Sequence, residues 1–228
     1  MSDSYKAPTM AQKMAAGEAP EILFWVGCAG SFDDRYKAVT LAFVKILNKV
    51  GVNFAVLGDE ETCTGDPARR AGNEYPALGG NYEVVHHSQY LQELINEGKI
   101  VMKDGGEFKG KKITFHDSCF LGRANDVYEA PRAVIKALDM ELVEMKRCKS
   151  KGLCCGAGGA QMFKEPEAGK KDINVERTEE ALQTGAKTIA VGCPFCLTMM
   201  TDGVKNKEKE TEVNVLDLAE LIAKDQQL

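Results

Sequence analysis

The sequence predicts an α/β fold built from two tandem repeats of a parallel strand–helix unit, of which the first is incomplete. Short apolar runs alternate along the chain with segments of helical periodicity, and this alternation favours parallel sheets. Two pairs of cysteines share a spacing of 35 positions: Cys28 with Cys63, and Cys119 with Cys154. In that register residues 43–47 fall on residues 134–138, which indicates a duplicated unit.

The first repeat is expected over residues 21–102, after a mobile N-terminal arm at residues 1–20. The arm is polar and shows no sustained periodicity. One helix of the repeat follows from apolar residues that recur on a single face, namely Val39, Phe43, Ile46, Leu47 and Val50. Strands are expected at residues 22–26, 54–57 and 83–86, and a second helix is expected from Ser88 to about Asn96.

The second repeat is expected over residues 113–228, after a Gly/Lys-rich linker at residues 103–112. Its apolar runs predict strands at residues 113–115, 142–143, 188–191 and 213–216. Helices are expected to begin near Pro131, to cover residues 175–184, to follow Cys193, and to close the chain after an Asp217 cap.

Composition narrows the class of protein. The chain has 228 residues, a formal charge of −5 and 44% hydrophobic residues, which is typical of a globular protein and excludes a disordered one. Its mild acidity argues against a nucleic-acid partner. No apolar run approaches the roughly 20 residues of a membrane span or the core of a signal peptide, so we expect a cytoplasmic protein without a membrane span of its own. In a reducing cytosol its eight cysteines indicate metal or redox chemistry rather than disulfides.

Five cysteines of the second repeat lie at or just after predicted strand ends: Cys119, Cys154, Cys155, Cys193 and Cys196. Because the carboxyl ends of parallel strands share one edge of a sheet, these sulfurs are expected to converge. Five thiolates repel one another unless cations neutralise them. A structural zinc uses four ligands and fits this set poorly, whereas an iron–sulfur cluster accommodates it better.

The first repeat lacks most of this set. Thr64 occupies the place of Cys155, and no Cys-x-x-Cys follows in the corresponding region. Cys28 and Cys63 alone cannot complete a second cluster of the same kind. We interpret them as a vestigial second metal site, with a labile shared metal, a partner's cofactor and ordinary core packing as alternatives.

The cysteine spacing, ending in Cys154-Cys155-Gly156 and Cys193-Pro194-Phe195-Cys196, resembles the cysteine-rich CCG domain. This domain occurs in a heterodisulfide reductase subunit and in iron–sulfur subunits of glycolate and lactate oxidation systems. The likeness runs from residue 21 onward and includes residues 65–70 and 174–180. Related sequences carry a further strand, helix and Cys-Pro-x-Cys after residues 72–75, a step of roughly 30 residues or more that this chain lacks.

The resemblance implies a [4Fe-4S]-type cluster held by the five cysteines, either cubane or non-cubane as in heterodisulfide reductase. It implies an oxidoreductase subunit that relays electrons between a ferredoxin-like or flavin protein and a small substrate or thiol, and that reaches a membrane only through a partner. Two alternatives stay open. One is a thiol–disulfide oxidoreductase that uses Cys193 and Cys196, and the other is a zinc-stabilised scaffold without catalytic activity.

Three histidines are further candidates for a metal site. His116 precedes Cys119 by three positions and could tune a site there, although a plain hydrogen-bonding role is the simpler interpretation. The His86-His87 pair could bind a metal, but a histidine pair at a strand end is more often structural.

Overall fold

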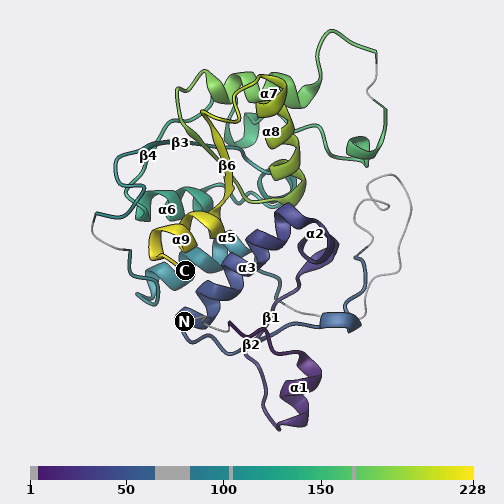
Figure 1. The fold of residues 1–228 in the computed structure, drawn as a ribbon, viewed down its shortest axis with the longest axis vertical. Helices are drawn as coiled ribbons and strands as arrows, with labels where there is room; N and C mark the ends of the chain where they lie inside the picture. Colours follow the sequence, from purple (N-terminus) through teal and green to yellow (C-terminus); the bar gives the residue numbers. More distant parts are fainter. Residues whose placement is uncertain (1–4, 65–82, 103–104, 166–167) are drawn as a thin grey trace.

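The computed structural model describes residues 5–64, 83–102, 105–165 and 168–228. It confirms the α/β class with parallel sheets (Figure 1). In the first half, β1 (Ile22–Leu23) pairs with β2 (Phe54–Ala55). In the second half, four parallel strands are arranged in the order β4-β3-β5-β6.

The first sheet is shorter than the sequence predicts. The expected strand at residues 22–26 stops at Leu23, and helix α2 (Gly27–Phe32) follows closely. The backbone amides of Val26 and Gly27 donate to the Glu61 carboxylate at 3.0 and 2.5 Å, which stabilises the start of the helix instead of an extended strand. The long helix α3 (Asp34–Lys49) is capped by Asp33, and η1 (Gly58–Glu60) follows β2.

The strand expected at residues 83–86 is wrong. These residues have no regular structure, and Val84 and Val85 are exposed. His86 instead caps helix α5 (His87–Asn96), because its Nδ1 accepts from the amide of Ser88 at 3.3 Å. Two consecutive valines resemble a strand in the sequence, but no strand pairs with them in the described residues.

Residues 5–20, expected to belong to an N-terminal arm, contact the first sheet. The Val56 amide donates to the Pro8 carbonyl, and the Met10 amide donates to the Val56 carbonyl. Thr9 then caps the short helix α1 (Met10–Ala15), which has no buried residue. The described part of the expected linker, residues 105–112, ends inside β3.

The second half follows the predicted order of strands and helices closely, with boundaries one or two residues from those expected. Its main elements are β3 (Lys112–Phe115), α6 (Glu129–Ala137), β4 (Glu141–Leu142), α7 (Ile173–Leu182), β5 (Thr188–Val191), α8 (Pro194–Asn206), β6 (Asn214–Asp217) and α9 (Leu218–Gln226). Three short turns of helix lie in its connections: the π-turn η2 (Phe120–Ala124), η3 (Lys149–Lys151) and η4 (Gln161–Phe163).

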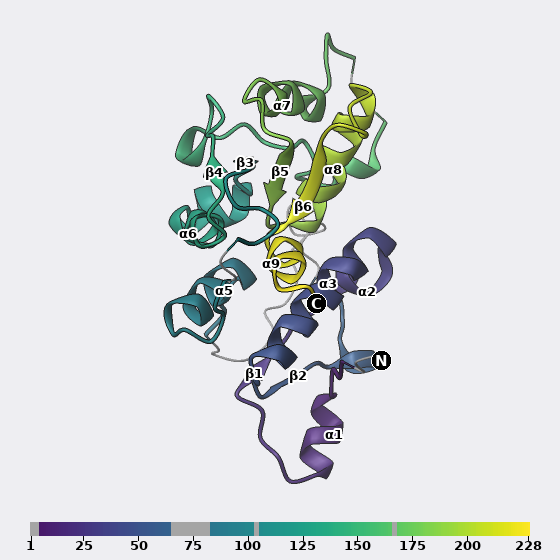
Figure 2. The same cartoon turned by 60° about the vertical axis from the view of Figure 1, so that its left-hand side comes forward.

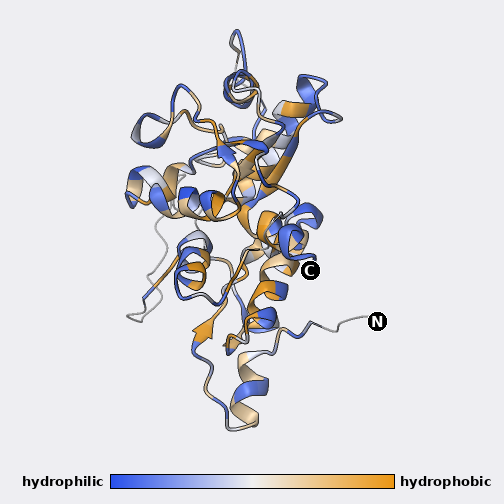
Figure 3. Cartoon of the chain, turned by 90° about the vertical axis from the view of Figure 1, so that its left-hand side faces the viewer, coloured by the Kyte–Doolittle hydropathy of each residue, from blue (hydrophilic) through white to orange (hydrophobic). Residues whose placement is uncertain are grey.

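Helix α9 joins the two halves. It contacts α3, α5 and α6, and it lies between the first-half helices and the four-stranded sheet (Figure 2). Leu47 of α3 and Leu221 of α9 are fully buried in one continuous hydrophobic core. Figure 3 shows hydrophobic residues along α3 and in the strands of the larger sheet, with hydrophilic residues on the outer turns. No helix among the described residues has both the length and the apolar character needed to cross a bilayer.

Candidate metal centre

Three adjacent strands of the larger sheet bring the five cysteines of the second half to one edge. Cys119 lies four residues beyond β3, at the start of η2. Cys154 and Cys155 lie in the connection that follows β4, and Cys193 and Cys196 lie where β5 passes into α8. Because β4, β3 and β5 are neighbours and parallel, sequence segments far apart in the chain end side by side.

The five sulfurs form a continuous series of contacts. Cys119 interacts with Cys154, Cys154 with Cys155, Cys155 with Cys196, and Cys196 with Cys193. The Sγ atoms of Cys155 and Cys196 are 3.5 Å apart. Cys155 and Cys196 are buried, while the other three are partly exposed. The structure therefore brings together all five sulfurs that the sequence singles out.

The protein alone stabilises only part of this set as thiolates. Hydrogen bonds from Cys119 and Cys155 lower the pKa of Cys154, and a hydrogen bond from Cys196 lowers the pKa of Cys193. The same contacts raise the pKa of the donors, which reaches about 12 for Cys155 and lies well above its usual range for Cys119 and Cys196. All five sulfurs can ionise together only if cations are bound among them.

Backbone amides supply part of the stabilisation. The amide of Gly156 donates to the sulfur of Cys154 at 3.3 Å. Gly156 has a φ of +93°, a backbone conformation that L-residues rarely adopt, so glycine is required for this amide to reach the sulfur. The amides of Phe195 and Cys196 at the start of α8 likewise lower the pKa of Cys193, which precedes Pro194 at the first helical position.

His116 is buried beside the sulfurs and is part of the site. One of its imidazole nitrogens lies within 4.8 Å of the sulfurs of both Cys155 and Cys196. Its Nδ1 is 2.9 Å from Nε of Arg177, and its Nε2 has no hydrogen-bond partner in the described part of the chain. Burial and the guanidinium of Arg177 lower the pKa of His116 to about 3, so the imidazole is neutral at physiological pH.

A buried ion network positions the segment that leads to Cys154. Arg132 donates to Asp117 at 2.8 and 3.0 Å and to Glu144 at 2.6 and 3.0 Å. The Asp117 carboxylate also accepts from the amide of Lys149 at 2.7 Å, which connects the end of β3 to the loop after β4. Sequence reasoning missed Arg132, Asp117 and Arg177; the position of Asp117 directly after His116 was the only local signal.

The first half supplies residues beside the cysteines. His86 Nε2 is 3.0 Å from the carbonyl of Gly192, which precedes Cys193, and His87 Nε2 is 3.0 Å from Asp217. Since protein groups contact both Nε2 atoms, the pair acts structurally here. Burial lowers the pKa of His86 to about 3; burial also opposes the charging of His87, but the Asp217 carboxylate raises its pKa.

Tyr36 of α3 approaches the same place. Burial raises the pKa of its hydroxyl, and the negative charges of Asp217, Cys193 and Cys196 raise it further. No local pattern indicates that α3 or α5 lies next to Cys193, because such contacts join residues more than 100 positions apart, as those of His86 and His87 do.

Cys28 and Cys63 are both exposed, Cys28 on α2 and Cys63 after η1. Among the described residues, the three-membered group suited to a metal is His116, Cys155 and Cys196, and it includes neither of these cysteines. The vestigial site assigned to them remains a prediction. Residues 65–70 and 72–75, which carry part of the family resemblance, lie outside the described residues. Cys148, outside the repeat register, is partly exposed, and burial raises its pKa.

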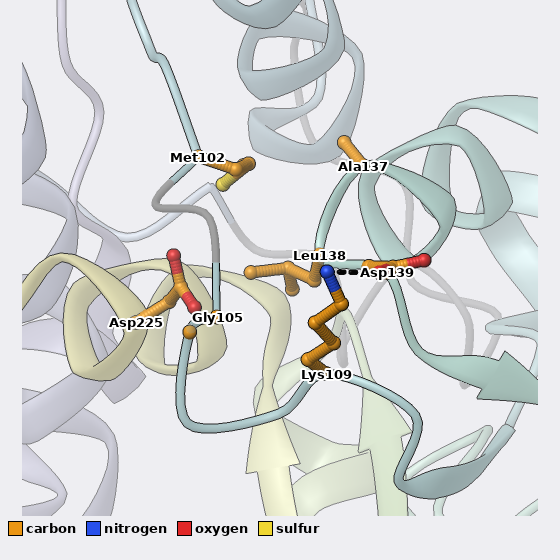
Figure 4. A pocket seen from close by; sticks show the side chains of 8 residues that line it. Met102, Gly105, Lys109, Ala137, Leu138, Asp139 and Asp225 are labelled. Atoms are coloured by element: carbon orange, nitrogen blue, oxygen red, sulfur yellow. Dashed lines mark ion pairs between the residues drawn. The ribbon is translucent and has the colours of Figure 1, made fainter.

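A cavity of about 210 Å³ lies apart from the cysteines, between α6, α9 and the turn before β3 (Figure 4). It is lined by Met102, Gly105, Gly106, Lys109, Ala137, Leu138, Asp139 and Asp225. The ion pair between Lys109 and Asp139, at 3.5 Å, lies at this cavity. None of the eight cysteines lines it, so it is separate from the candidate metal centre.

Comparison with known proteins connects the geometry to a family. The model of the cysteine-rich domain CCG matches residues 22–91 and 113–201. The chain is 43% identical to an EtfAB:quinone oxidoreductase of Syntrophomonas wolfei, with 91% of this chain and 35% of the relative covered. It is 41% identical to the probable iron-sulfur-binding oxidoreductase FadF of Bacillus subtilis, with 95% and 35% covered. It is 30% identical to a subunit of the dihydromethanophenazine:CoB–CoM heterodisulfide reductase of Methanosarcina barkeri, with 89% and 58% covered.

The chain thus spans about a third of the length of the first two relatives and more than half of the third. The first match extends over 250 positions, whereas 91% of 228 residues is only about 207. The difference of about 40 positions is large enough for the βαβ step of roughly 30 residues or more that this chain lacks after residues 72–75.

Proposed function

Since the chain belongs to the family of the cysteine-rich CCG domain, we propose that it is the iron–sulfur part of an electron-transferring oxidoreductase. In this proposal one cluster of the [4Fe-4S] type, cubane or non-cubane, is bound by Cys119, Cys154, Cys155, Cys193 and Cys196. Relatives named as iron-sulfur-binding support the coarser assignment of an iron–sulfur cluster.

The observation that carries the proposal is the continuous series of five sulfurs at one sheet edge, three of which stay protonated without cations. A four-ligand zinc leaves one of these sulfurs over. Several iron atoms offer enough positive charge and enough open positions for thiolates from all five. The donor set therefore fits an iron–sulfur cluster better than a single metal ion.

When bound, such a cluster supplies one-electron transfer at a potential set by its ligands and hydrogen bonds. The chain's own residues do the rest. The amides of Gly156, Phe195 and Cys196 stabilise negative charge on the sulfurs of Cys154 and Cys193. Tyr36 and His87, brought in by α3 and α5, lie next to the Cys193 side and reduce its contact with water.

The partners follow from the same reasoning. We propose that the chain exchanges electrons with a flavin protein or a ferredoxin-like protein on one side and with a small substrate or thiol on the other. The names of the relatives refer to EtfAB and quinone in one case and to a CoB–CoM heterodisulfide in another, which supports redox partners of these classes. A cytoplasmic setting agrees with eight cysteines that form no disulfide.

Anaerobic purification of the full chain tests the proposal. We expect iron and acid-labile sulfide in cluster stoichiometry, visible absorption, and an EPR signal in one redox state. Cys148→Ser is a matched control, because Cys148 lies outside the series of sulfurs and should leave the iron content unchanged. Absence of iron after reconstitution under reducing conditions contradicts the proposal, and a colourless protein with one zinc supports the scaffold alternative.

A second candidate function is thiol–disulfide exchange with Cys193 as the attacking thiolate. The observation that favours it is the lowered pKa of Cys193, caused by the Cys196 thiol and the amides of α8. In that reaction Cys193 attacks a substrate disulfide and releases one thiolate, and Cys196 then displaces the other. If Cys119→Ser keeps full activity while Cys193→Ser has none, exchange is favoured; if both lose iron together, the cluster is favoured.

A further inference from the structure

We propose that His116 donates a hydrogen bond from Nε2 to a sulfur atom of the cluster site, rather than serving as an iron ligand, and that Arg177 fixes His116 in this role. The inference rests on the proposed function, since the acceptor it names is the bound cluster or a thiolate that holds it. It adds two positioning residues to the five cysteines.

The tautomer of His116 follows from its partner. A guanidinium has only N–H donors and no acceptor. Arg177 Nε is 2.9 Å from Nδ1 of His116, so the lone pair of Nδ1 must accept this bond. A neutral imidazole carries one proton, which therefore resides on Nε2.

That Nε2–H group lacks an acceptor among the described residues. His116 is 0% exposed, so bulk water does not reach the donor either. Buried donors are almost always hydrogen-bonded, and one without a partner indicates a missing ligand atom. The imidazole lies within 4.8 Å of the Cys155 and Cys196 sulfurs, where negatively charged sulfur atoms of the site would accept the bond.

The same contact excludes His116 as a metal ligand, although its distance to the two cysteines would allow it. A histidine that binds a metal through Nε2 needs its lone pair there and donates Nδ1–H to a carbonyl or carboxylate. Here Nδ1 faces a donor. Binding through Nδ1 is blocked as well, because Arg177 occupies that lone pair.

Arg177 is held rigidly enough to impose this tautomer. It is 0% exposed, and its Nη1 donates to the Arg147 carbonyl at 2.7 Å and to Glu180 at 3.2 Å. Its Nη2 is another buried donor without a partner in the described part of the chain. The donor of His116 and the positive charge of Arg177 both favour the more negative, reduced cluster, so they should raise its reduction potential.

The experiment compares His116→Leu with His116→Gln in the anaerobically purified full chain. Leu removes the donor, whereas the Gln amide can place an N–H near the position of Nε2. We expect unchanged iron and sulfide content in both variants, a lower midpoint potential in His116→Leu, and a potential nearer the wild type in His116→Gln. ENDOR should show a proton coupling in the wild type that exchanges in D₂O and is absent in His116→Leu.

Each outcome has a distinct meaning. Unchanged potential and unchanged exchangeable coupling in a cluster-loaded His116→Leu protein overturn the inference and leave the proposed function intact. A wild type that binds no iron overturns the proposed function itself. If His116→Leu does not fold, ¹⁵N-histidine labelling of the wild type decides: a weak nitrogen coupling supports a hydrogen bond to sulfur, and a strong coupling shows a directly bound nitrogen and overturns the inference.

Discussion

The two halves of the chain share a cysteine spacing but differ in what surrounds it. In the first half Cys28 and Cys63 are exposed, and the sheet beside them has two strands of two residues each. In the second half the equivalent Cys119 and Cys154 contact each other and belong to a series of five sulfurs. Equal spacing in the sequence therefore does not by itself make a metal site.

The strand β5 accounts for much of the difference. It lies beside β3 and carries Cys193 and Cys196 to the edge at which Cys119 and Cys154 meet. Among the described residues the first sheet has no third strand, and the sequence there has no Cys-x-x-Cys. A cluster site of this type requires the third strand end as well as the first two.

The first half has a different use for the shared register. Val44 and Leu47 are buried, as are Ile135 and Leu138 at the equivalent positions, so both repeats keep the same buried helix face. The strands are offset, however, since Ile22 pairs with Phe54, 32 positions on, and Ile113 pairs with Leu142, 29 positions on. The first-half helix face packs on α9 and places Tyr36 near Cys193.

The strongest test of this contrast replaces equivalent cysteines in the two halves. Cys154→Ser removes a sulfur that contacts two others, and we expect it to abolish most iron binding, measured as iron per chain after anaerobic purification. Cys63→Ser, at the equivalent position of the first half, should leave the iron content within error of the wild type. Loss of iron in Cys63→Ser would show that the first half does hold a metal.

Local sequence signals were sufficient for the second half. Its strands, the Asp217 cap of α9 and the convergence of five sulfurs follow from apolar runs, capping residues and the parallel order of strands. The strand at residues 83–86 could not be excluded, because an apolar pair such as Val84-Val85 becomes a strand only when a neighbour pairs with it. The His116–Arg177 contact joins residues 61 positions apart, so only the tertiary structure reveals it.

A second test measures how firmly the first half is joined to the second. Leu47→Ala empties a fully buried site in the core shared with α9 and should lower the free energy of unfolding by about 2–5 kcal/mol. Leu41→Ala is the matched control, because Leu41 lies on the same helix and is 50% exposed. Chemical denaturation should show one transition for both variants; two separate transitions would mean that the halves unfold independently.

The last test concerns the two neighbouring histidines of the first half, which should respond to pH with opposite sign. Burial holds the pKa of His86 near 3, against an ordinary value of 6.5, so the folded chain binds fewer protons than the unfolded chain between these limits. The free energy of unfolding therefore falls as the pH is lowered through this window, by up to about 1.4 kcal/mol per pH unit from this group. His86→Gln, which can keep an N–H near the Gly192 carbonyl, should flatten this acid dependence.

His87 provides the control because the Asp217 carboxylate raises its pKa above the ordinary value. Its pairing with Asp217 stabilises the fold fully below about pH 6.5, and this contribution is lost as the pH rises through the raised pKa. His87→Gln should thus reduce stability most at acidic pH, where His86→Gln improves it. Denaturation curves between pH 5 and 8, roughly the range in which histidines change charge, separate the two effects, and identical profiles for both variants would contradict the assignment of one neutral and one charged histidine next to Cys193.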